Sequence, residues 1–248
     1  MNLAIDIGNT AVKWATFEGR TMMESGKWRV ESGEWRVENG EWRTESGERR
    51  VENIMVCASG DATEVMERLK GLHAPLVTLH ADTALPIKLD YKTPASLGPD
   101  RIAAACGAWA LHRGEDCLVV DAGTCITVDF LDREGVYHGG AIMPGLGMNL
   151  QALHTFTAKL PLISLEGVEK APVLGRTTEE SIVAGTLGAT MLALAGYVAL
   201  YRQRCPQLCV LLSGGDAARL TAAGATGWEL QPQLTLIGLN EIMTYHEE

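Results

Sequence analysis

Apolar and polar positions along the chain form two kinds of pattern, one typical of strands and one typical of helices. Short apolar runs bounded by turn residues predict strands, and segments with an apolar residue every three or four positions predict helices. We expect strands at residues 3–7, 12–17, 54–58, 76–79, 86–89, 117–120, 126–131, 137–142 and 208–212. We expect helices at residues 61–72, 101–112, 145–153 and 178–204. This mixture predicts an α/β fold.

The last of these helices contains twenty consecutive residues without a charge, at positions 182–201. That length is enough to span a bilayer. The segment is rich in Gly, Ala and Thr, and strands lie on both sides of it in the chain. We therefore interpret it as a core or interface helix and expect no membrane association. Thr177 and Thr178 are its N-cap candidates, and Glu179 and Glu180 suit its first turn.

Residues 24–52 hold a tandem repeat of seven residues, ESGKWRV, ESGEWRV, ENGEWRT and ESGERRV. A glycine in every unit costs a helix about 1 kcal/mol each time, which disfavours a coiled coil. Ser-Gly or Asn-Gly forms a two-residue hairpin turn, so a small meander fits better. In that register Trp28 lies opposite Val37 and Trp35 opposite Val30. The alternative is a recent expansion without a defined structure, and no catalytic chemistry is visible in it.

Charge and cysteine usage narrow the functional class. The 248 residues carry a net charge of −10 and no Lys/Arg cluster, which argues against a nucleic-acid partner. Six scattered cysteines and the absence of a basic, apolar leader favour a reduced cytoplasmic protein. The spacing of Cys205 and Cys209 lacks a second pair or a nearby histidine cluster, so we do not expect a metal there.

Two segments about 115 residues apart repeat one pattern. Residues 4–19 read AIDIGNTAVKWATFEG, and residues 119–135 read VVDAGTCITVDFLDREG. Each is an apolar strand, Asp-x-Gly, a Thr, a second strand and a glycine turn. The repetition predicts two related lobes, residues 1–115, with the repeat at 24–52 as an insertion, and residues 116–248.

These two loops have the chemistry of a phosphate clamp. An Asp at a strand end offers hard oxygen ligands to a cation, and Gly lets the backbone approach a phosphate. Backbone amides and the Thr hydroxyl donate to phosphate oxygens, and Lys13 adds a positive charge. Turns use the same residues structurally, so one copy is weak evidence; two copies favour an ATP tail with its Mg²⁺.

Two further motifs accompany the loops. Gly98-Pro99-Asp100-Arg101 precedes the helix at 101–112. Asp100 could simply cap that helix, or it could be a base that deprotonates an attacking hydroxyl, with Arg101 holding an anion. The turn Ser213-Gly214-Gly215-Asp216 follows a strand and would suit a nucleoside, although it is unspecific.

Taken in order, these motifs resemble type III pantothenate kinases of the actin/Hsp70/sugar-kinase superfamily. The matching segments are DIGNT, Y-x-x-P-x-x-L-GPDR, VVDAGT, GGAIMPGLGMN, AKLP, GRTTEESIVAG and LLSGGD, which span nearly the whole chain. The resemblance implies two ribonuclease-H-like lobes and ATP-dependent phosphorylation of pantothenate to 4′-phosphopantothenate, the first step of coenzyme A biosynthesis. It also implies a homodimer whose pantothenate pocket borrows residues from the partner subunit.

The resemblance also assigns roles to residues. It implies Asp100 as the catalytic base. It implies a monovalent cation, K⁺ or NH₄⁺, at Asp121, and the Mg²⁺ of Mg-ATP at Asp6. The implied ATP-binding residues are Asp6, Ile7, Gly8, Asn9, Thr10, Ala11, Val12, Lys13 and Thr124. The implied substrate-binding residues are Tyr91, Gly98, Pro99, Asp100, Arg101 and Thr178.

The sequence departs from the family pattern in four places. The family's GADR is GPDR here, its DFGTATT is DAGTCIT, and its Asn-Thr is Thr177-Thr178. At residues 31–52 the repeat replaces a family helix. Two other functions stay open from the residues alone. One is a kinase of the same superfamily acting on another small molecule. The other is a nucleotide-binding scaffold that has lost catalysis and docks partners through the Trp-rich repeat.

Overall fold

The computed structural model describes residues 1–29, 37–38, 41–44 and 47–247. The chain divides into two compact units. The first unit contains residues 1–113, 135–137 and 233–248, and the second contains residues 114–134 and 138–232. The sequence division at residue 115 put the C-terminal residues with the second lobe, but the structure puts them in the first unit. The reason is that helix α7 (Leu234–Glu247) packs against α2 (Pro99–Leu111) and the strands of the first unit.

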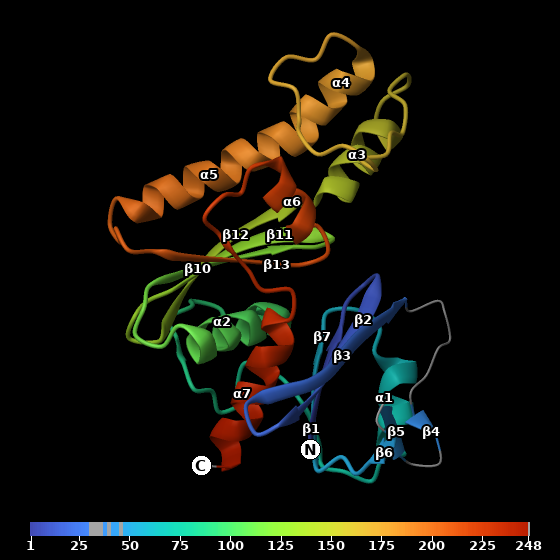
Figure 1. The fold of residues 1–248 in the computed structure, drawn as a ribbon, viewed down its shortest axis with the longest axis vertical. Helices are drawn as coiled ribbons and strands as arrows, with labels where there is room; N and C mark the ends of the chain where they lie inside the picture. Colours follow the sequence, from blue (N-terminus) through green and yellow to red (C-terminus); the bar gives the residue numbers. More distant parts are fainter. Residues whose placement is uncertain (30–36, 39–40, 45–46, 248) are drawn as a thin grey trace. The chain divides into compact units, whose positions relative to one another are not determined.

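A five-stranded sheet forms the centre of the first unit (Figure 1). Its central strand β1 (Asn2–Ile7) runs antiparallel to β2 (Ala11–Glu18) and parallel to β7 (Asn53–Ala58). Strand β3 (Thr21–Arg29) lies beyond β2, and β8 (Leu76–Thr78) lies beyond β7. The strand order is therefore β3-β2-β1-β7-β8.

Side chains of β1 alternate between the two faces of this sheet. Leu3, Ile5 and Ile7 pack into one apolar cluster with residues of α1 (Thr63–Lys70). The other face, which carries Asp6, is covered by α2 and α7, and Figure 1 shows these helices on the side of the sheet opposite α1. This alternation puts Asp6 on the same side of the sheet as the start of α2.

Helices α2 and α7 approach each other closely through two glycines. A Cβ on Gly107 would lie 2.2 Å from the carbonyl oxygen of Leu234, and one on Gly238 would lie 1.8 Å from that of Ala103. Real side chains cannot occupy such positions, so glycine is required for the two backbones to touch. The contact fixes α2 on the sheet, and with α2 the motif at its first turn.

The second unit repeats the strand order of the first. Its strand β10 (Cys117–Ala122) runs antiparallel to β11 (Cys125–Leu131) and parallel to β13 (Cys209–Ser213). Strand β12 (Val136–Pro144) lies beyond β11, and β14 (Glu229–Leu230) lies beyond β13. The order β12-β11-β10-β13-β14 thus matches β3-β2-β1-β7-β8 position by position.

The first unit also contains a short pair of parallel strand segments. Strand β9 (Lys88–Leu89) pairs with Val136 and Tyr137, the first two residues of β12. A single 3₁₀ turn, η2 (Pro94–Ser96), follows β9 and leads into α2. These elements bring the segment around Tyr91 next to the buried Tyr137.

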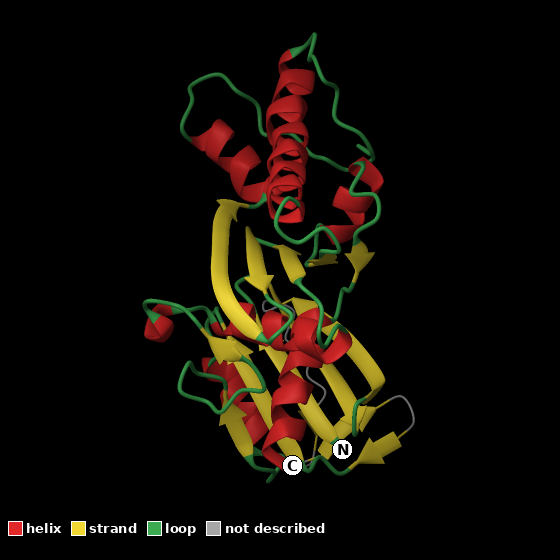
Figure 2. Cartoon of the chain, turned by 90° about the vertical axis from the view of Figure 1, so that its left-hand side faces the viewer, coloured by secondary structure: helices red, strands yellow, loops and turns green. Residues whose placement is uncertain are grey.

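One long helical rod covers the sheet of the second unit (Figures 1 and 2). It consists of α4 (Thr178–Val183), a π-helical turn η3 (Ala184–Gly188) and α5 (Ala189–Arg202). By length and composition this rod could cross a membrane. Its inner side joins the unit's core through Leu187, Leu194 and Val198, while Leu192 and Leu200 on the outer side are exposed. Helices α3 (Leu146–Thr155) and α6 (Ala217–Ala223) complete the unit.

The later described residues of the seven-residue repeat form a separate small antiparallel sheet. It contains β4 (Val37–Glu38), β5 (Glu41–Thr44) and β6 (Gly47–Arg49). Trp28 is the partner of Val12 across β2 and β3, so the expected pair of Trp28 with Val37 does not form. The longer β3 takes up the first repeat unit as an edge of the main sheet. The expected pair of Trp35 and Val30 lies outside the described residues.

Candidate active site

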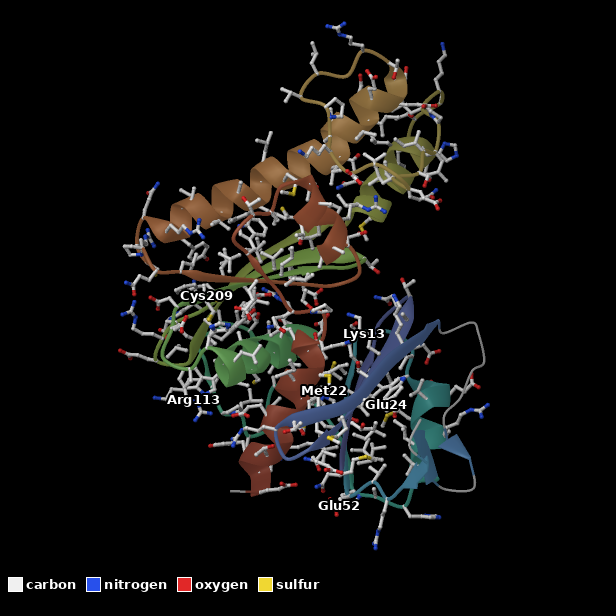
Figure 3. All side chains as sticks on the ribbon, viewed as in Figure 1. Lys13, Met22, Glu24, Glu52, Arg113 and Cys209 are labelled. Atoms are coloured by element: carbon white, nitrogen blue, oxygen red, sulfur yellow. The ribbon has the colours of Figure 1, made fainter. Side chains whose placement is uncertain are left out.

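Asp6 lies where three strands of the first unit run side by side. It is opposite Lys13 on β2 and beside Cys57 on β7 in the sheet register. Cross-strand neighbours project from the same face of a sheet. Accordingly, Lys13 Nζ lies 4.0 Å from Asp6 Oδ2, and the Cys57 thiol donates a hydrogen bond of 3.2 Å to Asp6 Oδ1. Lys13 projects from β2 as labelled in Figure 3.

The electrostatics of Asp6 reflect its burial. Asp6 is 9% exposed. Loss of hydration raises the pKa of its carboxyl, the Lys13 charge and the Cys57 hydrogen bond oppose that rise, and the Asp100 charge adds to it. Burial also raises the pKa of the Cys57 thiol well above its ordinary value, so the sulfur carries its proton at neutral pH. The carboxylates of Asp6 and Asp100 thus share one electrostatic environment.

The loop after Asp6 is tight at its base and open at its tip. The Gly8 amide donates to the carbonyl of Ala11 at 3.0 Å. A Cβ on Gly60 would lie 2.6 Å from the Gly8 carbonyl oxygen, so the turn after β7 lies directly against this loop. Asn9 and Thr10 are exposed. Of the other expected ATP-binding residues, Ile7 and Val12 have fully buried side chains, and Ala11 is half-buried. Ile7 and Val12 can therefore reach a ligand only through their backbone.

The motif Gly98 to Arg101 forms the first turn of α2. Gly98 is the N-cap, Pro99 takes the first helical position, and the half-buried Asp100 follows it. Asp100 Oδ1 accepts a hydrogen bond of 2.9 Å from the Arg101 amide. A Cβ on Gly98 would lie 2.4 Å from that same oxygen. Glycine at this position therefore leaves room for the Asp100 carboxylate.

Arg101 is a buried cation held by an aromatic side chain. It is 7% exposed, and its guanidinium carbon lies 5.9 Å from the centre of the Tyr91 ring. The Tyr91 ring in turn lies 6.1 Å from the Tyr137 ring. A guanidinium at this distance from an aromatic face is attracted by the ring quadrupole. Tyr91 and Arg101, which the sequence assigned to substrate binding, thus lie together.

A cavity of about 640 Å³ borders this motif inside the first unit. Its volume is in the range of pockets that hold small metabolites. One wall is the segment from Pro94 to Pro99, and the other follows the carboxyl ends of β7 and β8. The lining residues are Ala58, Thr78, Leu79, His80, Ala81, Asp82, Pro94, Ala95, Leu97 and Pro99.

In the second unit Asp121 lies at the end of β10, beside Ser213 of β13. The following loop closes with the Gly123 amide donating to the Cys125 carbonyl at 2.9 Å. Thr124 is exposed, and its carbonyl accepts a hydrogen bond of 3.0 Å from the Gly145 amide. The loop therefore presents the Thr124 side chain to solvent while its backbone is held in place.

The turn from Ser213 to Asp216 lies directly against Asp121. Gly214 has φ +94°, and a Cβ there would lie 2.5 Å from Asp121 Oδ1 and 2.3 Å from the Ala122 carbonyl oxygen. The Asp216 amide donates to that same carbonyl at 2.9 Å. Ser213 is 1% exposed, and its Oγ is one of the buried oxygens that lack a hydrogen-bond partner within the described chain. The glycine is needed both for its backbone conformation and for this close approach.

Thr178 is the first residue of α4 and is exposed. Thr177 is the N-cap, with its Oγ1 accepting a hydrogen bond of 3.1 Å from the Glu180 amide. The sequence prediction of an N-cap at Thr177 or Thr178 is therefore resolved in favour of Thr177. This leaves the Thr178 hydroxyl available for a ligand at the helix start.

Both expected cations fit the side chains present at their sites. Mg²⁺ prefers carboxylate oxygens, and Asp6 offers a buried carboxylate whose pKa is raised further by the Asp100 charge. At the second site the Asp121 carboxylate lies beside the unpartnered, buried Ser213 Oγ. Oxygen donors in these settings suit Mg²⁺ at the first site and a monovalent cation at the second.

Comparison of this sequence with known proteins identifies its family. The family model of type III pantothenate kinases matches residues 2–200. The type III pantothenate kinase of Bacteroides fragilis is 39% identical over 247 residues, which cover 99% of this chain and 98% of that protein. The chain belongs to the type III pantothenate kinase family. A type III pantothenate kinase from Phocaeicola vulgatus is 35% identical over the full length of both chains.

Solved structures agree on the fold. A protein from Campylobacter jejuni classed in the Baf family of transcriptional activators superposes with a TM-score of 0.62 at 18% identity, covering 99% of this chain and 98% of that one. The likeness shows that the chain shares its mixed α/β fold with this structure.

Sequence reasoning missed two features of this site. It placed Cys57 in an apolar strand, but it did not detect the hydrogen bond from Cys57 to Asp6. It also missed the contact between Gly60 and Gly8. A signal was available for Cys57, because a parallel β1–β7 pair with equal strand ends puts residue 57 beside residue 6. That register could not be read from either strand alone.

Proposed function

We propose that this type III pantothenate kinase transfers the γ-phosphoryl group of ATP to the primary hydroxyl of pantothenate. The products are 4′-phosphopantothenate and ADP, and the reaction is the first step of coenzyme A biosynthesis. Family membership over nearly the whole chain supports the reaction. The observation that carries the site is that the buried Asp6, held by Lys13 and Cys57, lies on the sheet face that α2 covers, and that Asp100 stands in the first turn of α2.

ATP binds through the two equivalent hairpin loops, one in each unit, which we propose are ribonuclease-H-like lobes. In the first lobe the segment from Asp6 to Lys13 holds the phosphates with backbone amides, the Thr10 hydroxyl and the Lys13 ammonium. In the second lobe Thr124 contacts ATP. Asn9, Thr10 and Thr124 are exposed to solvent. Fixed amide dipoles and a lysine stabilise developing negative charge without reorganisation at the moment of reaction.

Two cations offset the negative charge of the phosphate groups in this proposal. Asp6 holds the Mg²⁺ of Mg-ATP, and Asp121 holds K⁺ or NH₄⁺. The bound cations supply neutralisation of the negative charge that spreads over the transferring phosphoryl group. The protein's contribution is to hold carboxylates at the ends of β1 and β10, where glycine loops let phosphate approach.

Asp100 is the catalytic base in this proposal. Its carboxylate accepts the proton of the pantothenate hydroxyl while the hydroxyl oxygen forms a bond to the γ-phosphorus. The bond from that phosphorus to the β–γ bridging oxygen breaks, and ADP leaves. Arg101, Tyr91, Gly98 and Pro99 bind and orient pantothenate beside the cavity at Leu97 and Pro99. Thr178 completes the substrate site from the partner subunit.

The reaction is tested by ADP release from purified protein with Mg-ATP, with and without pantothenate. We expect turnover that depends on pantothenate and increases when K⁺ or NH₄⁺ replaces Na⁺. ADP release that no pantothenate concentration accelerates would contradict the reaction. Equal rates in K⁺, NH₄⁺ and Na⁺ would remove the monovalent cation from the proposal and leave the reaction standing.

We also propose a cytoplasmic homodimer joined through the outer side of α5, which exposes Leu192 and Leu200. Burying these leucines against a second copy removes apolar surface from water, which favours association. Light scattering should give twice the 26.7 kDa mass of one chain. Leu192→Glu should shift the protein to the monomer, and a wild-type monomer at working concentration would contradict the dimer.

The Trp-rich repeat is, in our proposal, an insertion in the first lobe with no part in catalysis. The described strands β4, β5 and β6 pair only with one another. A variant in which a short Gly/Ser linker replaces residues 31–50 keeps Val51, which is 6% exposed and packs in the core. We expect this variant to retain pantothenate-dependent turnover. Loss of turnover in a folded variant would assign the repeat a role in the reaction.

A further inference from the structure

We propose that Cys57 is a positioning residue for the reaction, because its thiol fixes the Asp6 carboxylate in the orientation that receives Mg-ATP. The inference rests on the proposed function of Asp6. The hydrogen bond from Cys57 Sγ to Asp6 Oδ1 is 3.2 Å long and joins neighbouring residues of the parallel strands β7 and β1. Cys57 is fully buried, so its contact with Asp6 is with a fixed partner rather than with solvent.

The geometry divides the two carboxylate oxygens between different partners. Oδ1 accepts from Cys57, and Oδ2 faces Lys13 at 4.0 Å. A carboxylate rotates broadly about its last side-chain bond unless a hydrogen bond selects one orientation. Among the described residues, Cys57 on the neighbouring strand donates the hydrogen bond to Asp6 Oδ1. Its loss would let the carboxylate turn, which weakens cation binding by about ten-fold or more in comparable sites.

The second unit has a small hydroxyl residue at the corresponding place, although its Oγ lacks a hydrogen-bond partner among the described residues. Ser213 occupies the corresponding place beside Asp121, on the strand parallel to β10. A hydroxyl is therefore accommodated in a buried strand of this topology, where Ser213 is 1% exposed. Cys57→Ser keeps a hydrogen donor at nearly the same place. Cys57→Val keeps the volume and suits a strand but cannot donate.

Cys106 provides a matched control. It is also a fully buried thiol of the first unit, located in α2. Burial raises the pKa of Cys106 above its ordinary value, and no contact with Asp6 contributes to that shift. Cys106→Val therefore changes a buried thiol in the same way without removing a hydrogen bond to Asp6.

The experiment measures binding of Mg²⁺ with a non-hydrolysable ATP analogue by calorimetry, without pantothenate, and then the kinetics. We expect Cys57→Val to raise the Kd of the Mg-analogue and the KM for Mg-ATP about ten-fold. The KM for pantothenate should stay within two-fold, and Cys57→Ser and Cys106→Val should bind like the wild type. Thermal unfolding of each variant checks the fold, and Cys57→Ala replaces Cys57→Val if the valine disturbs packing.

Several outcomes would overturn the proposal. Wild-type affinity in both Cys57→Val and Cys57→Ala would show that the hydrogen bond does not matter. Equal weakening in Cys57→Ser and Cys57→Val, or in Cys106→Val, would indicate a packing effect. A wild-type protein that binds the Mg-analogue but never phosphorylates pantothenate would overturn the proposed function and leave this inference intact. A wild type that does not bind the Mg-analogue would overturn both.

Discussion

Asp6 and Asp121 occupy the same position in two sheets that share the order of five strands. Each is the next-to-last residue of the central strand, β1 or β10, and each is the Asp of an Asp-x-Gly motif that leads into an antiparallel partner strand. Each also has a small polar residue beside it on the following parallel strand, Cys57 or Ser213. The equivalence extends to the next turn, since Gly60 lies against the first loop and Gly214 against the second.

The two carboxylates differ in the residue that faces each of them across its hairpin. Asp6 faces Lys13 across its hairpin, whereas Asp121 faces Thr127. A lysine beside the first Asp favours a site for polyphosphate, and a neutral hydroxyl residue beside the second favours a lone cation. The fold thus gives both aspartates the same place in their sheets, and the residue across the hairpin determines the net charge beside each of them.

Asp100→Asn should abolish most turnover while ATP still binds. Asparagine keeps the shape of the side chain and can still accept from the Arg101 amide at 2.9 Å, but it cannot take the substrate proton. We expect kcat to fall by a factor on the order of 10²–10⁴. Steady-state kinetics and nucleotide calorimetry measure the two effects. Near-wild-type kcat would remove Asp100 from the role of base.

Gly98→Ala should impair catalysis without unfolding the protein. The added Cβ would lie 2.4 Å from Asp100 Oδ1 and must displace that carboxylate. We expect kcat to fall at least ten-fold, since small displacements of reacting groups are costly. Gly147→Ala is the control, because a Cβ on this exposed residue of α3 meets nothing within 4 Å. Equal kinetics for both variants would contradict the steric argument.

Asp6→Asn should stabilise the nucleotide-free protein while it weakens Mg-ATP binding. The pKa of Asp6 is raised mainly by burial. The stability contribution of such an acid is complete below its unfolded pKa and is lost as pH rises through the higher folded pKa. At pH 7 the charged form therefore lowers stability, and asparagine removes that cost. We expect Tm to increase by a few degrees. A decrease at pH 7 that disappears at pH 4 would contradict the assignment of the shift to burial.

Replacing both Arg20 and Arg113 should destabilise the protein more than replacing Glu241, the residue that they both contact. Both guanidinium groups donate to Glu241, at 2.9 Å from Arg20 Nε and 2.9 Å from Arg113 Nη2, and Glu241 is 3% exposed. Arg113 follows α2 (Figure 3). Glu241→Gln leaves two exposed arginines and should cost about 1–2 kcal/mol.

Replacing both arginines by Met leaves a buried carboxylate without a cation, which should cost about 3–5 kcal/mol. Urea unfolding of the single and double variants measures the difference. If Glu241→Gln proved the more damaging change, the carboxylate would not depend on these arginines for its burial.

Asp116 should contribute stability that is lost in acid. Arg133 binds both of its carboxylate oxygens, with the amide of Arg133 2.9 Å from Oδ1 and Nε 3.1 Å from Oδ2. This pairing holds the pKa of Asp116 below its ordinary value of 3.8. For an acid with a lowered folded pKa, the stabilisation is present above the unfolded pKa and lost as pH falls through the folded one.

Arg133→Ala should therefore lower the stability at pH 7, and its effect should shrink as pH is lowered through about 4 and below. Unfolding of the wild type and the variant at pH 7, 5 and 3 measures this dependence. A cost that is the same at all three pH values would mean that Arg133 acts by packing.

Much of the fold was readable because local patterns were strong. The apolar runs before Asp6 and before Asp121 form β1 and β10, and the periodic segment after Gly98 forms α2. Helix α7 escaped prediction because its buried surface includes polar Asn240 and Glu241, which disrupt an apolar stripe. Its partners Arg20 and Arg113 are more than a hundred residues away in the chain, so no local window contains them.

The sequence by itself determined most of the central strands, helix α2, the two Asp-x-Gly hairpins and the family, since these depend on residue order and on side chains within a few positions. Tertiary structure alone decided which residues meet. The register of β1 with β7 brought Cys57 to Asp6, and the packing of α2 on the sheet brought Asp100 into the electrostatic environment of Asp6. The physical reason is that strand register and helix packing are set by contacts between distant segments, whose free energy depends on the whole core rather than on any local pattern.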